Sequence, residues 1–212
     1  MPRYSAIAFD LLTGLIDSWT LWNRVAGNAE AGRRWRTRYL ELTYGAGAYR
    51  SYEELVSESA RDAGVPAAAA QDLVLGWDDL TPWPEDRAVL GELGARGFRL
   101  AIVTNCSEWL ARRAAARVGV EFAVLVSAER AGFYKPRPEP YRLMLDEVGQ
   151  TAGRVLFVAG SPSDVAGAAA VGMDVFWHNR IGLPPVTPEP SRLIGAGTSL
   201  ETLLPIAGDR LP

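Results

Sequence analysis

The sequence predicts an α/β doubly wound fold, in which helices flank a parallel sheet and a helical insertion follows the first strand. Two observations favour the sheet: short, nearly uninterrupted apolar runs recur along the chain, and segments with helical spacing of apolar residues lie between most of them. A third observation favours the insertion, because residues 15–82 are rich in helix formers and break the alternation. Strands that alternate with helices are typical of a sheet covered on both faces.

The expected strands are apolar runs that each end at a small or polar residue. They cover residues 6–9, 100–103, 122–126, 155–158 and 175–177. The helices between them are expected at 85–95, 107–118, 139–148 and 162–171, where apolar residues recur at spacings of three and four and several segments end near a glycine. A Pro-rich connection over 182–190 precedes a short strand at 192–194 and a terminal helix at about 200–206.

The insertion contains four candidate helices, at 21–25, 31–43, 51–63 and 67–75, before a Thr-Pro-Trp-Pro sequence at 81–84 ends it. We therefore predict a core formed by residues 1–14 and 83–212 and a helical cap formed by residues 15–82. A cap inserted after the first strand can close over the carboxyl edge of the sheet and exclude water from it.

The composition excludes several classes of protein. A chain of 212 residues that is 48% apolar and 22% charged can bury a sizeable core, with or without a modest insertion. The net charge of −3 gives no electrostatic reason to expect nucleic acid or an anionic membrane as a partner. One cysteine and one histidine, Cys106 and His178, exclude a disulfide framework and most zinc sites. No long apolar run begins the chain, so we expect no secretory signal and a cytoplasmic location.

The candidate functional residues follow the ends of predicted strands, where ligands of an open parallel sheet gather. Lys135, after the third strand, is the only lysine of the chain, which favours a site that needs a compact ammonium. Two carboxylates, one ammonium and several neutral donors favour nucleophilic chemistry by a carboxylate. This set consists of Asp10, Thr104, Asn105, Lys135, Ser161 and Asp164.

Structural roles stay open for the same residues. Ser161 and Asp164 suit the N-cap and the first turn of the helix at 162–171, and Thr104 and Asn105 can cap the helix that begins near Glu108. Lys135 can also be the only lysine by chance, in a chain whose other basic residues are mostly arginines. Asp10, at the end of the first strand, has no obvious helix to cap, because the insertion follows it directly.

Three other residues receive structural assignments from composition alone. Arg36 lies in an Arg-rich helix, where most such side chains are solvated, so nothing in the composition singles it out. Cys106 is expected to be a small buried side chain, since no histidine lies near it in sequence. His178 is expected to be a hydrogen-bonded structural imidazole.

Four motifs occur in an order and spacing typical of one superfamily. They are Ala-Phe-Asp-Leu at 8–11, Ile-Val-Thr-Asn at 102–105, Tyr-Lys-Pro at 134–136 followed by Tyr141, and Leu-Phe-Val at 156–158 followed by Asp164. With Trp-Arg at 35–36 and Leu-Glu at 40–41, the chain resembles the haloacid dehalogenase superfamily over nearly its whole length, and within it the type II L-2-haloacid dehalogenases. This resemblance implies a Rossmann-like core with a helical cap.

The resemblance also implies a mechanism without metal or cofactor. Asp10 would displace halide from C2 of an L-2-haloalkanoate to form an ester, Lys135 would keep Asp10 ionised, and Asp164 would activate the water that cleaves the ester. The implied partner is a small carboxylate substrate, and a homodimer is a further expectation. The implied binding residues are Arg36 and Asn105 for the halide and Thr104 with nearby amides for the substrate carboxylate, with Leu12, Leu40 and Ser161 as further residues of the substrate site. Tyr141 would support the pairing of Asp10 with Lys135, and Ser161 would be what remains of the groups that hold water beside Asp164.

Departures from the family pattern bear on the alternatives. Magnesium-dependent phosphatases of the superfamily carry a second Asp and a further acid at the positions of Leu12 and Gly160. Without these acids a magnesium site would be poor and an alcohol leaving group would receive no proton, which disfavours the phosphatase hypothesis. Ala159, Ser161 and Ser163 stand where the dehalogenases have Ser, Asn and Trp. These changes predict a wider site and leave a non-catalytic carboxylate binder as a third hypothesis.

Overall fold

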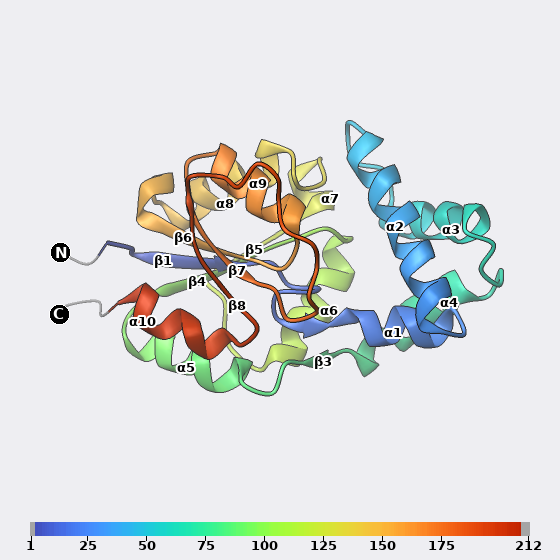
Figure 1. The fold of residues 1–212 in the computed structure, drawn as a ribbon, viewed down its shortest axis with the longest axis horizontal. Helices are drawn as coiled ribbons and strands as arrows, with labels where there is room; N and C mark the ends of the chain where they lie inside the picture. The colour runs from blue at the N-terminus through green and yellow to red at the C-terminus, as the bar shows by residue number, and fades with distance from the viewer. Residues whose placement is uncertain (1–2, 209–212) are drawn as a thin grey trace.

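A parallel sheet forms the centre of the protein. The computed structural model describes residues 3–208. Within them the main sheet consists of β1 (Ala6–Phe9), β4 (Arg99–Thr104), β5 (Val124–Ser127), β6 (Val155–Ala159), β7 (Asp174–His178) and β8 (Leu193–Gly197). Their order is β5-β4-β1-β6-β7-β8 (Figure 1). Phe9 on β1 lies opposite Ile102 on one side and Val158 on the other, so the next residue emerges at the middle of the carboxyl edge.

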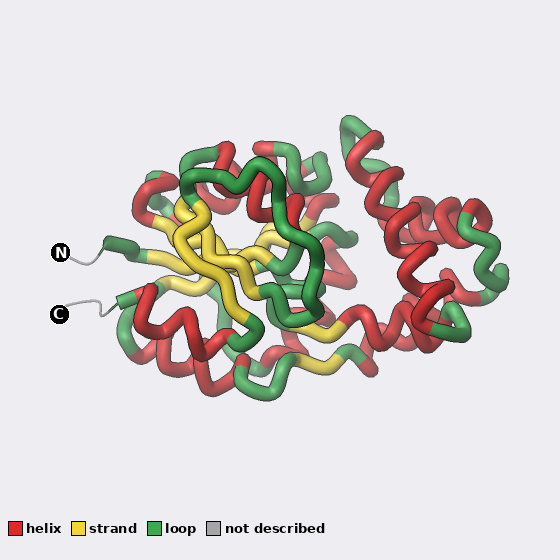
Figure 2. Tube along the Cα trace, in the orientation of Figure 1, coloured by secondary structure: helices red, strands yellow, loops and turns green. Residues whose placement is uncertain are grey.

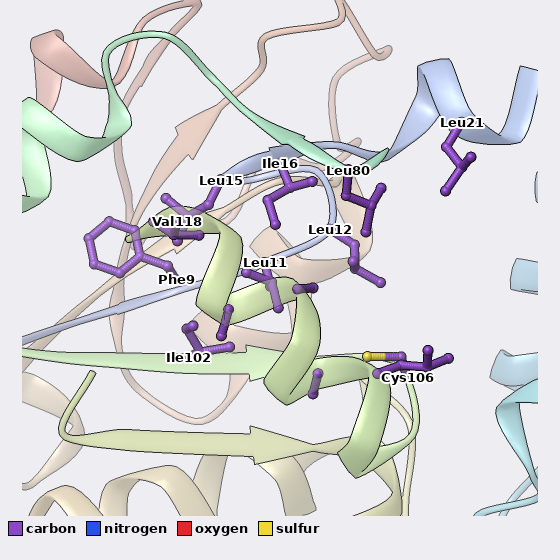
Figure 3. Close-up of a cluster of buried hydrophobic side chains, with 14 of the residues drawn as sticks. Phe9, Leu11, Leu12, Leu15, Ile16, Leu21, Leu80, Ile102, Cys106 and Val118 are labelled. Carbon is purple, nitrogen blue, oxygen red and sulfur yellow. The ribbon is translucent and has the colours of Figure 1, made fainter. Parts of the chain in front are cut away.

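Helices cover both faces of this sheet because alternate side chains of a strand point to opposite faces. Ile7 and Phe9 on β1 belong to one buried cluster, and Ala6 and Ala8 belong to the other. Figure 3 shows part of the first cluster, in which Phe9 lies near the helix that carries Val118. The described helices of the core are α5 (Asp86–Ala95), α6 (Glu108–Val118), α7 (Ala128–Ala131), α8 (Pro138–Val148), η2 (Ala152–Arg154), α9 (Pro162–Ala170), η3 (Leu200–Leu203) and α10 (Leu204–Ala207). In Figure 1, α8 and α9 lie above the sheet and α5 and α10 below it.

The part of the chain that runs from the end of β1 to the start of α5 is almost entirely helical and lies to one side of the sheet (Figure 2). It contains α1 (Ser18–Val25), α2 (Ala29–Gly45), α3 (Tyr52–Asp62), α4 (Ala69–Leu75) and η1 (Gly76–Asp79), which we call the cap. The chain enters it at β2 (Ile16–Asp17) and leaves it at β3 (Thr81–Pro82), and these two short strands pair antiparallel. The division into a core of residues 1–14 and 83–212 and a cap of residues 15–82 stays a prediction.

Aromatic side chains hold the cap helices together. The ring centroids of Trp22 and Trp35 are 4.5 Å apart, and those of Trp22 and Tyr39 are 5.4 Å apart. The Trp35 indole also donates to the carbonyl of Val56, which joins α2 to α3. Burial of such large side chains stabilises the packing of the cap helices, together with aliphatic side chains such as Leu55 and Leu73.

The predicted fold class is confirmed, while several element boundaries differ. The first cap helix begins at Ser18 rather than at residue 21, because Asp17 accepts a hydrogen bond from the amide of Thr20 and caps it. The third long strand covers Val124–Ser127, the last strand extends to Gly197, and the terminal helix begins as a 3-10 turn. The pairing of β2 with β3 was not predicted, since two residues give no periodicity. Among residues 3–208, no helix is long and apolar enough to cross a bilayer.

Candidate active site

Asp10 follows the central strand and is held from one side by backbone amides. Its Oδ2 accepts hydrogen bonds from the amides of Thr13 at 3.1 Å and Gly14 at 2.9 Å. A β-carbon built on Gly160, at the end of β6, would lie 2.3 Å from the same oxygen. The carboxylate is therefore fixed with Oδ2 against the chain and with Oδ1 directed elsewhere.

Lys135 places its ammonium between two carboxylates. Its Nζ lies 2.8 Å from Asp10 Oδ1 and 3.0 Å from Asp164 Oδ1. Lys135 lies in the loop between α7 and α8, and Asn105 fixes this loop: its Nδ2 donates to the Lys135 carbonyl at 3.0 Å, and its Oδ1 accepts from the Lys135 amide at 2.7 Å. The single lysine of the chain is thus the charge that allows two acids to share one buried site.

Asp164 lies in the first turn of α9, which Ser161 caps by accepting from the Asp164 amide. The Tyr141 hydroxyl, on α8, donates to Asp164 Oδ1 at 3.2 Å. A β-carbon at Gly167 would lie 2.8 Å from the Tyr141 oxygen, so the small residue on α9 allows this approach. The Asp164 side chain is therefore fixed both by the packing of α8 against α9 and by the Ser161 cap at the start of α9.

Burial and charge separate the pKa values of the two acids. Burial alone would raise the pKa of Asp10, but the Lys135 ammonium and the amides of Gly14 and Thr13 outweigh it, and the pKa lies below its usual value. For Asp164 burial raises the pKa, and the negative charge of Asp10 adds to this effect, so Lys135 does not lower it to the usual value. Burial would lower the pKa of Lys135, but the two carboxylates raise it above its usual value. The site thus holds one firmly ionised carboxylate and one that binds a proton more readily.

Arg36 is a buried cation without an acidic partner. It extends from α2 of the cap and is only 9% exposed. Its two terminal nitrogens donate to Ser18 Oγ and Thr13 Oγ1, each at 2.8 Å, and no carboxylate among residues 3–208 pairs with it. Burial lowers the pKa of Arg36, yet a guanidinium stays charged at neutral pH.

Aromatic faces take the place of a carboxylate beside this cation. The guanidinium carbon of Arg36 lies 4.1 Å from the ring centroid of Trp19 and 5.7 Å from that of Trp22. The Trp19 indole nitrogen is buried and has no hydrogen-bond partner in the described part of the chain. A positive charge held by neutral groups keeps its attraction for an anion that enters the site.

The structure brings most of the predicted site residues together. Hydrogen bonds connect Asp10, Lys135, Asp164 and Tyr141 to one another, and Ser161 to Asp164. Thr13 joins Arg36 to the Asp10 loop, so this arginine is not the solvated surface residue that composition favoured. The residues involved are Asp10, Arg36, Asn105, Lys135, Tyr141, Ser161 and Asp164.

Three predicted residues lie nearby without a direct contact to these groups. Thr104 is buried at the end of β4, and its hydroxyl contacts Cys106 Sγ at 3.8 Å. Leu12 is part of the main apolar cluster, and Leu40, on α2, packs against it. Their roles toward a substrate stay predictions.

The two structural assignments at Cys106 and His178 have different outcomes. Cys106 is fully buried, and burial raises its pKa, as expected for an inert thiol. His178 Nδ1 contacts the carbonyl of Gly14 at 2.8 Å, but its Nε2 has no partner among the described residues, so only half of this imidazole is hydrogen-bonded.

Trp19, Gly160 and Tyr44 were missed as site residues. Trp19 and Tyr44 follow the apolar and aromatic spacing of ordinary cap helices, and Gly160 is one of 21 glycines. Their contacts, with Arg36, Asp10 and Ser163 respectively, exist only in the folded chain.

The donor set does not fit a magnesium ion. Within residues 3–208, no group of three or more His, Cys, Asp or Glu side chains is placed to hold a metal. One oxygen of Asp10 accepts from two amides, and the other, like Asp164 Oδ1, contacts the Lys135 ammonium. Magnesium needs several oxygen ligands in near-octahedral order, which these residues do not supply.

Comparisons with known proteins agree with this geometry. A family model described as a haloacid dehalogenase-like hydrolase matches residues 4–172. The chain is 31% identical over 198 residues to haloacetate dehalogenase H-2 of Moraxella sp. (strain B), and the match covers 86% of this chain and 88% of that protein. It is 30% identical over 198 residues to (S)-2-haloacid dehalogenase H-109 of Pseudomonas putida, with the same coverage of 86% and 88%.

A solved structure agrees as well. The crystal structure of the L-2-haloacid dehalogenase RSc1362 superposes with a TM-score of 0.86 at 26% identity, and it covers 97% of this chain and 99% of that one. The resemblance inferred from the motifs is thereby confirmed. Since the family model spans well over half of the sequence, the chain belongs to the haloacid dehalogenase-like hydrolases.

Proposed function

We propose that the protein hydrolyses the carbon–halogen bond of L-2-haloalkanoic acids through an ester on Asp10, without a metal ion. The observation that carries this proposal is the position of the Lys135 ammonium, 2.8 Å from Asp10 Oδ1 and 3.0 Å from Asp164 Oδ1. It supplies an ionised nucleophile and a second acid with a higher pKa beside it. A pair of acids with separated pKa values is suited to a nucleophile and a general base.

In the first step Asp10 attacks C2 of the substrate. A bond forms between Asp10 Oδ1 and C2, and the carbon–halogen bond breaks with its electron pair on the halide. Oδ1 is the attacking oxygen because Oδ2 is held by two amides and faces Gly160. The buried position removes water from the carboxylate, and fixed positioning contributes up to about 7 to 11 kcal/mol of the reduction in barrier.

Arg36 attracts the anions of this step. Two of its nitrogens bond to neutral hydroxyls, and its remaining N–H groups are available for a halide leaving C2. Asn105 keeps one N–H beyond the one that it gives to the Lys135 carbonyl. Thr104 and nearby amides would bind the substrate carboxylate, with Leu12 and Leu40 on the apolar side of the substrate.

In the second step water attacks the ester carbon of Asp10. Asp164 accepts a proton from this water, a role that its raised pKa favours. The ester carbonyl is then Oδ2, and the negative charge that develops on it meets the amides of Thr13 and Gly14 at 3.1 and 2.9 Å. Backbone amides preorganised in this way stabilise an oxyanion without reorientation. The intermediate collapses by breaking the bond between its carbon and Oδ1, and Oδ1 leaves with the 2-hydroxy acid after taking the proton from Asp164. Asp10, whose pKa is low, then passes the remaining water proton to Asp164 and is ionised again.

Halide release tests this function directly. The expected result is release of chloride from L-2-chloropropionate in the presence of EDTA, faster than from the D-enantiomer and unchanged by added Mg²⁺. Hydrolysis of small phosphate esters with Mg²⁺, without halide release from a broad panel of haloacids, would replace the proposal with a phosphatase. Binding of a haloacid without halide release and without added mass on Asp10 would instead identify a non-catalytic carboxylate binder.

Two further expectations belong to this proposal. The single cysteine, Cys106, is buried and unpaired, which is compatible with the reducing cytoplasm that we propose as the location. A homodimer is proposed from the family resemblance, and size-exclusion chromatography with light scattering tests it.

A further inference from the structure

Three hydroxyl groups join the cap to the buried acids. Ser161 Oγ lies 3.0 Å from Ser163 Oγ, which lies 2.5 Å from the phenol oxygen of Tyr44. At the inner end, Ser161 Oγ accepts from the Asp164 amide at 3.3 Å, and the Ser161 side chain lies close enough to the Asp164 carboxylate to lower its pKa. At the outer end, Tyr44 is 43% exposed. In both hydroxyl–hydroxyl contacts either oxygen can be the donor, so a proton can move along them in either direction.

The proposed reaction produces a proton inside a site with little access to water. Overall, the haloacid and water give a hydroxy acid, a halide ion and one proton. The attack by Asp10 moves no proton, so the excess proton arises when water cleaves the ester. It rests on Asp164, because the pKa of this acid is raised and that of Asp10 is lowered. Asp10, Lys135 and Asp164 are only 6%, 2% and 4% exposed, so none of them delivers a proton readily to solvent.

We propose that Ser161, Ser163 and Tyr44 form the path by which this proton leaves Asp164 for solvent. This inference rests on the proposed hydrolysis. The Asp164 proton passes to Ser161 Oγ while the Ser161 hydroxyl proton passes to Ser163 Oγ. The Ser163 proton then passes to the Tyr44 oxygen, and the Tyr44 proton passes to water or to a buffer base. Each oxygen ends with one proton, and the two acids return to their starting charge.

The path crosses from the cap to the core, because Tyr44 belongs to α2 and Ser163 to α9. Other contacts hold the same two parts together. The Tyr39 hydroxyl donates to the carbonyl of Asn105 at 2.8 Å, and the Ser107 hydroxyl donates to Glu53 Oε1 at 2.7 Å. Loss of one hydroxyl from the path should therefore leave the cap in place and affect mainly the transfer of protons.

The test compares Tyr44→Phe and Ser163→Ala with the matched control Ser107→Ala, which also removes one serine contact between cap and core. Halide release in the first turnover should be unchanged in all three variants, because that step moves no proton. Steady-state turnover should fall about tenfold in the two path variants, which is less than the about 10²- to 10⁴-fold loss expected for removing a general base itself. Small buffers such as imidazole should restore this rate in a concentration-dependent manner and should not affect the wild type or Ser107→Ala.

The outcomes separate the path from the proposed function. Normal halide release by the wild type, with path variants that turn over at the wild-type rate, would overturn the path alone. A slow variant that buffer does not restore, or that is equally slow in the first turnover, would show a structural role for the contact and would also overturn the path. Absence of halide release from the wild type would overturn the proposed function and the path together.

Discussion

A β-carbon at Gly160 would lie 2.3 Å from Asp10 Oδ2 and 2.5 Å from the amide nitrogen of Gly14. Real side chains do not approach other atoms so closely, and the contacted backbone cannot move as the end of a flexible side chain can. The backbone directly after β6 therefore closes one side of the nucleophile and leaves Oδ1 as its reactive oxygen. The same contact leaves no room at this position for the acid that a magnesium-dependent phosphatase would need.

Gly160→Ala should reduce activity while the protein stays folded. The added carbon would displace Asp10 or the Gly14 amide, and a displacement of about 1 Å at a reacting group costs on the order of 10²-fold in rate. Gly153→Ala is the control, since a β-carbon there meets nothing within 4 Å. Halide release and circular dichroism check the two properties. Wild-type activity in Gly160→Ala would show that Asp10 is not held as described.

Lys135→Met should shift the acid limb of kcat/KM to higher pH. In the wild type the ammonium keeps the pKa of Asp10 low, so the nucleophile stays ionised as the pH falls. Without that charge, burial and the nearby carboxylate raise the pKa of Asp10, and activity should be lost at a higher pH than in the wild type. The exposed cation Arg137, which pairs with Glu139, provides the control Arg137→Met, whose profile should not move. An unmoved limb in Lys135→Met would contradict the assigned charge pairing.

Asp164→Asn should trap the ester on Asp10. The first step does not use Asp164, but the loss of the general base should slow ester hydrolysis by about 10²- to 10⁴-fold. Intact-mass spectrometry should therefore show the mass of the substrate's carboxyalkyl group on the variant, and peptide mapping should locate it at Asp10. Asp146→Asn, which changes an exposed acid on α8, is the control and should retain no added mass.

Acidification should reproduce this trapped state in the wild type. Since the pKa of Asp164 is raised and that of Asp10 is lowered, falling pH protonates Asp164 first and leaves the nucleophile ionised. Rapid-quench experiments should then show an initial burst of halide whose amplitude grows as the pH falls. Equal slowing of both steps would contradict the order of the two pKa values.

Trp19→Leu should weaken the binding of halide. The indole ring lies 4.1 Å from the Arg36 guanidinium and fixes it without neutralising it. A stacked cation of this kind gains about 0.5 to 2 kcal/mol, so its loss should raise the inhibition constant of bromide by about 2- to 30-fold. Trp109→Leu is a matched control, because Trp109 stacks on Arg113 in the same way, 4.3 Å away, but on α6. Equal inhibition constants for bromide in the two variants would show that Trp19 does not support halide binding.

The position of the site could be predicted because buried parallel strands leave a clear pattern in a sequence. An uninterrupted apolar run that ends at Asp10 marks both a strand and its carboxyl end, and the same holds for the run before Ser161. The pairing of Asp10 with Lys135, 125 residues apart, follows no local pattern, and only the family resemblance suggested it.

The parts that were not predicted depend on tertiary contacts. Composition alone makes Arg36 look like a surface arginine, and only the family resemblance placed it at the halide; its contacts with Trp19 and Thr13 appear in the folded chain. Gly160 acquires its importance from a single close approach, and Tyr44 from a serine on a helix 119 positions away along the chain. Periodicity describes which face of an element is buried, and it does not describe which residue of another element lies against that face.

Asp86→Asn should stabilise the protein, and by more as the pH rises. Asp86, at the start of α5, is fully buried, and neither of its carboxyl oxygens has a hydrogen-bond partner in the described part of the chain. Burial, with a contribution from the charge of Glu85, raises its pKa to about 8. In the unfolded chain an aspartate has a pKa of about 3.9, so between these values the folded state holds a proton that the unfolded state releases.

The contribution of Asp86 to the free energy of unfolding should therefore be fully retained below a pH of about 4. It should decline as the pH rises to about 8, by at most about 1.4 kcal/mol for each pH unit. Asparagine is neutral at every pH and avoids this cost. The melting temperatures of wild type and Asp86→Asn should accordingly diverge between pH 4 and about 8 and run parallel above it. Asp79→Asn, which changes an exposed acid, should show no such divergence. Parallel curves for Asp86→Asn over the whole range would mean that this carboxyl is ionised in the folded protein.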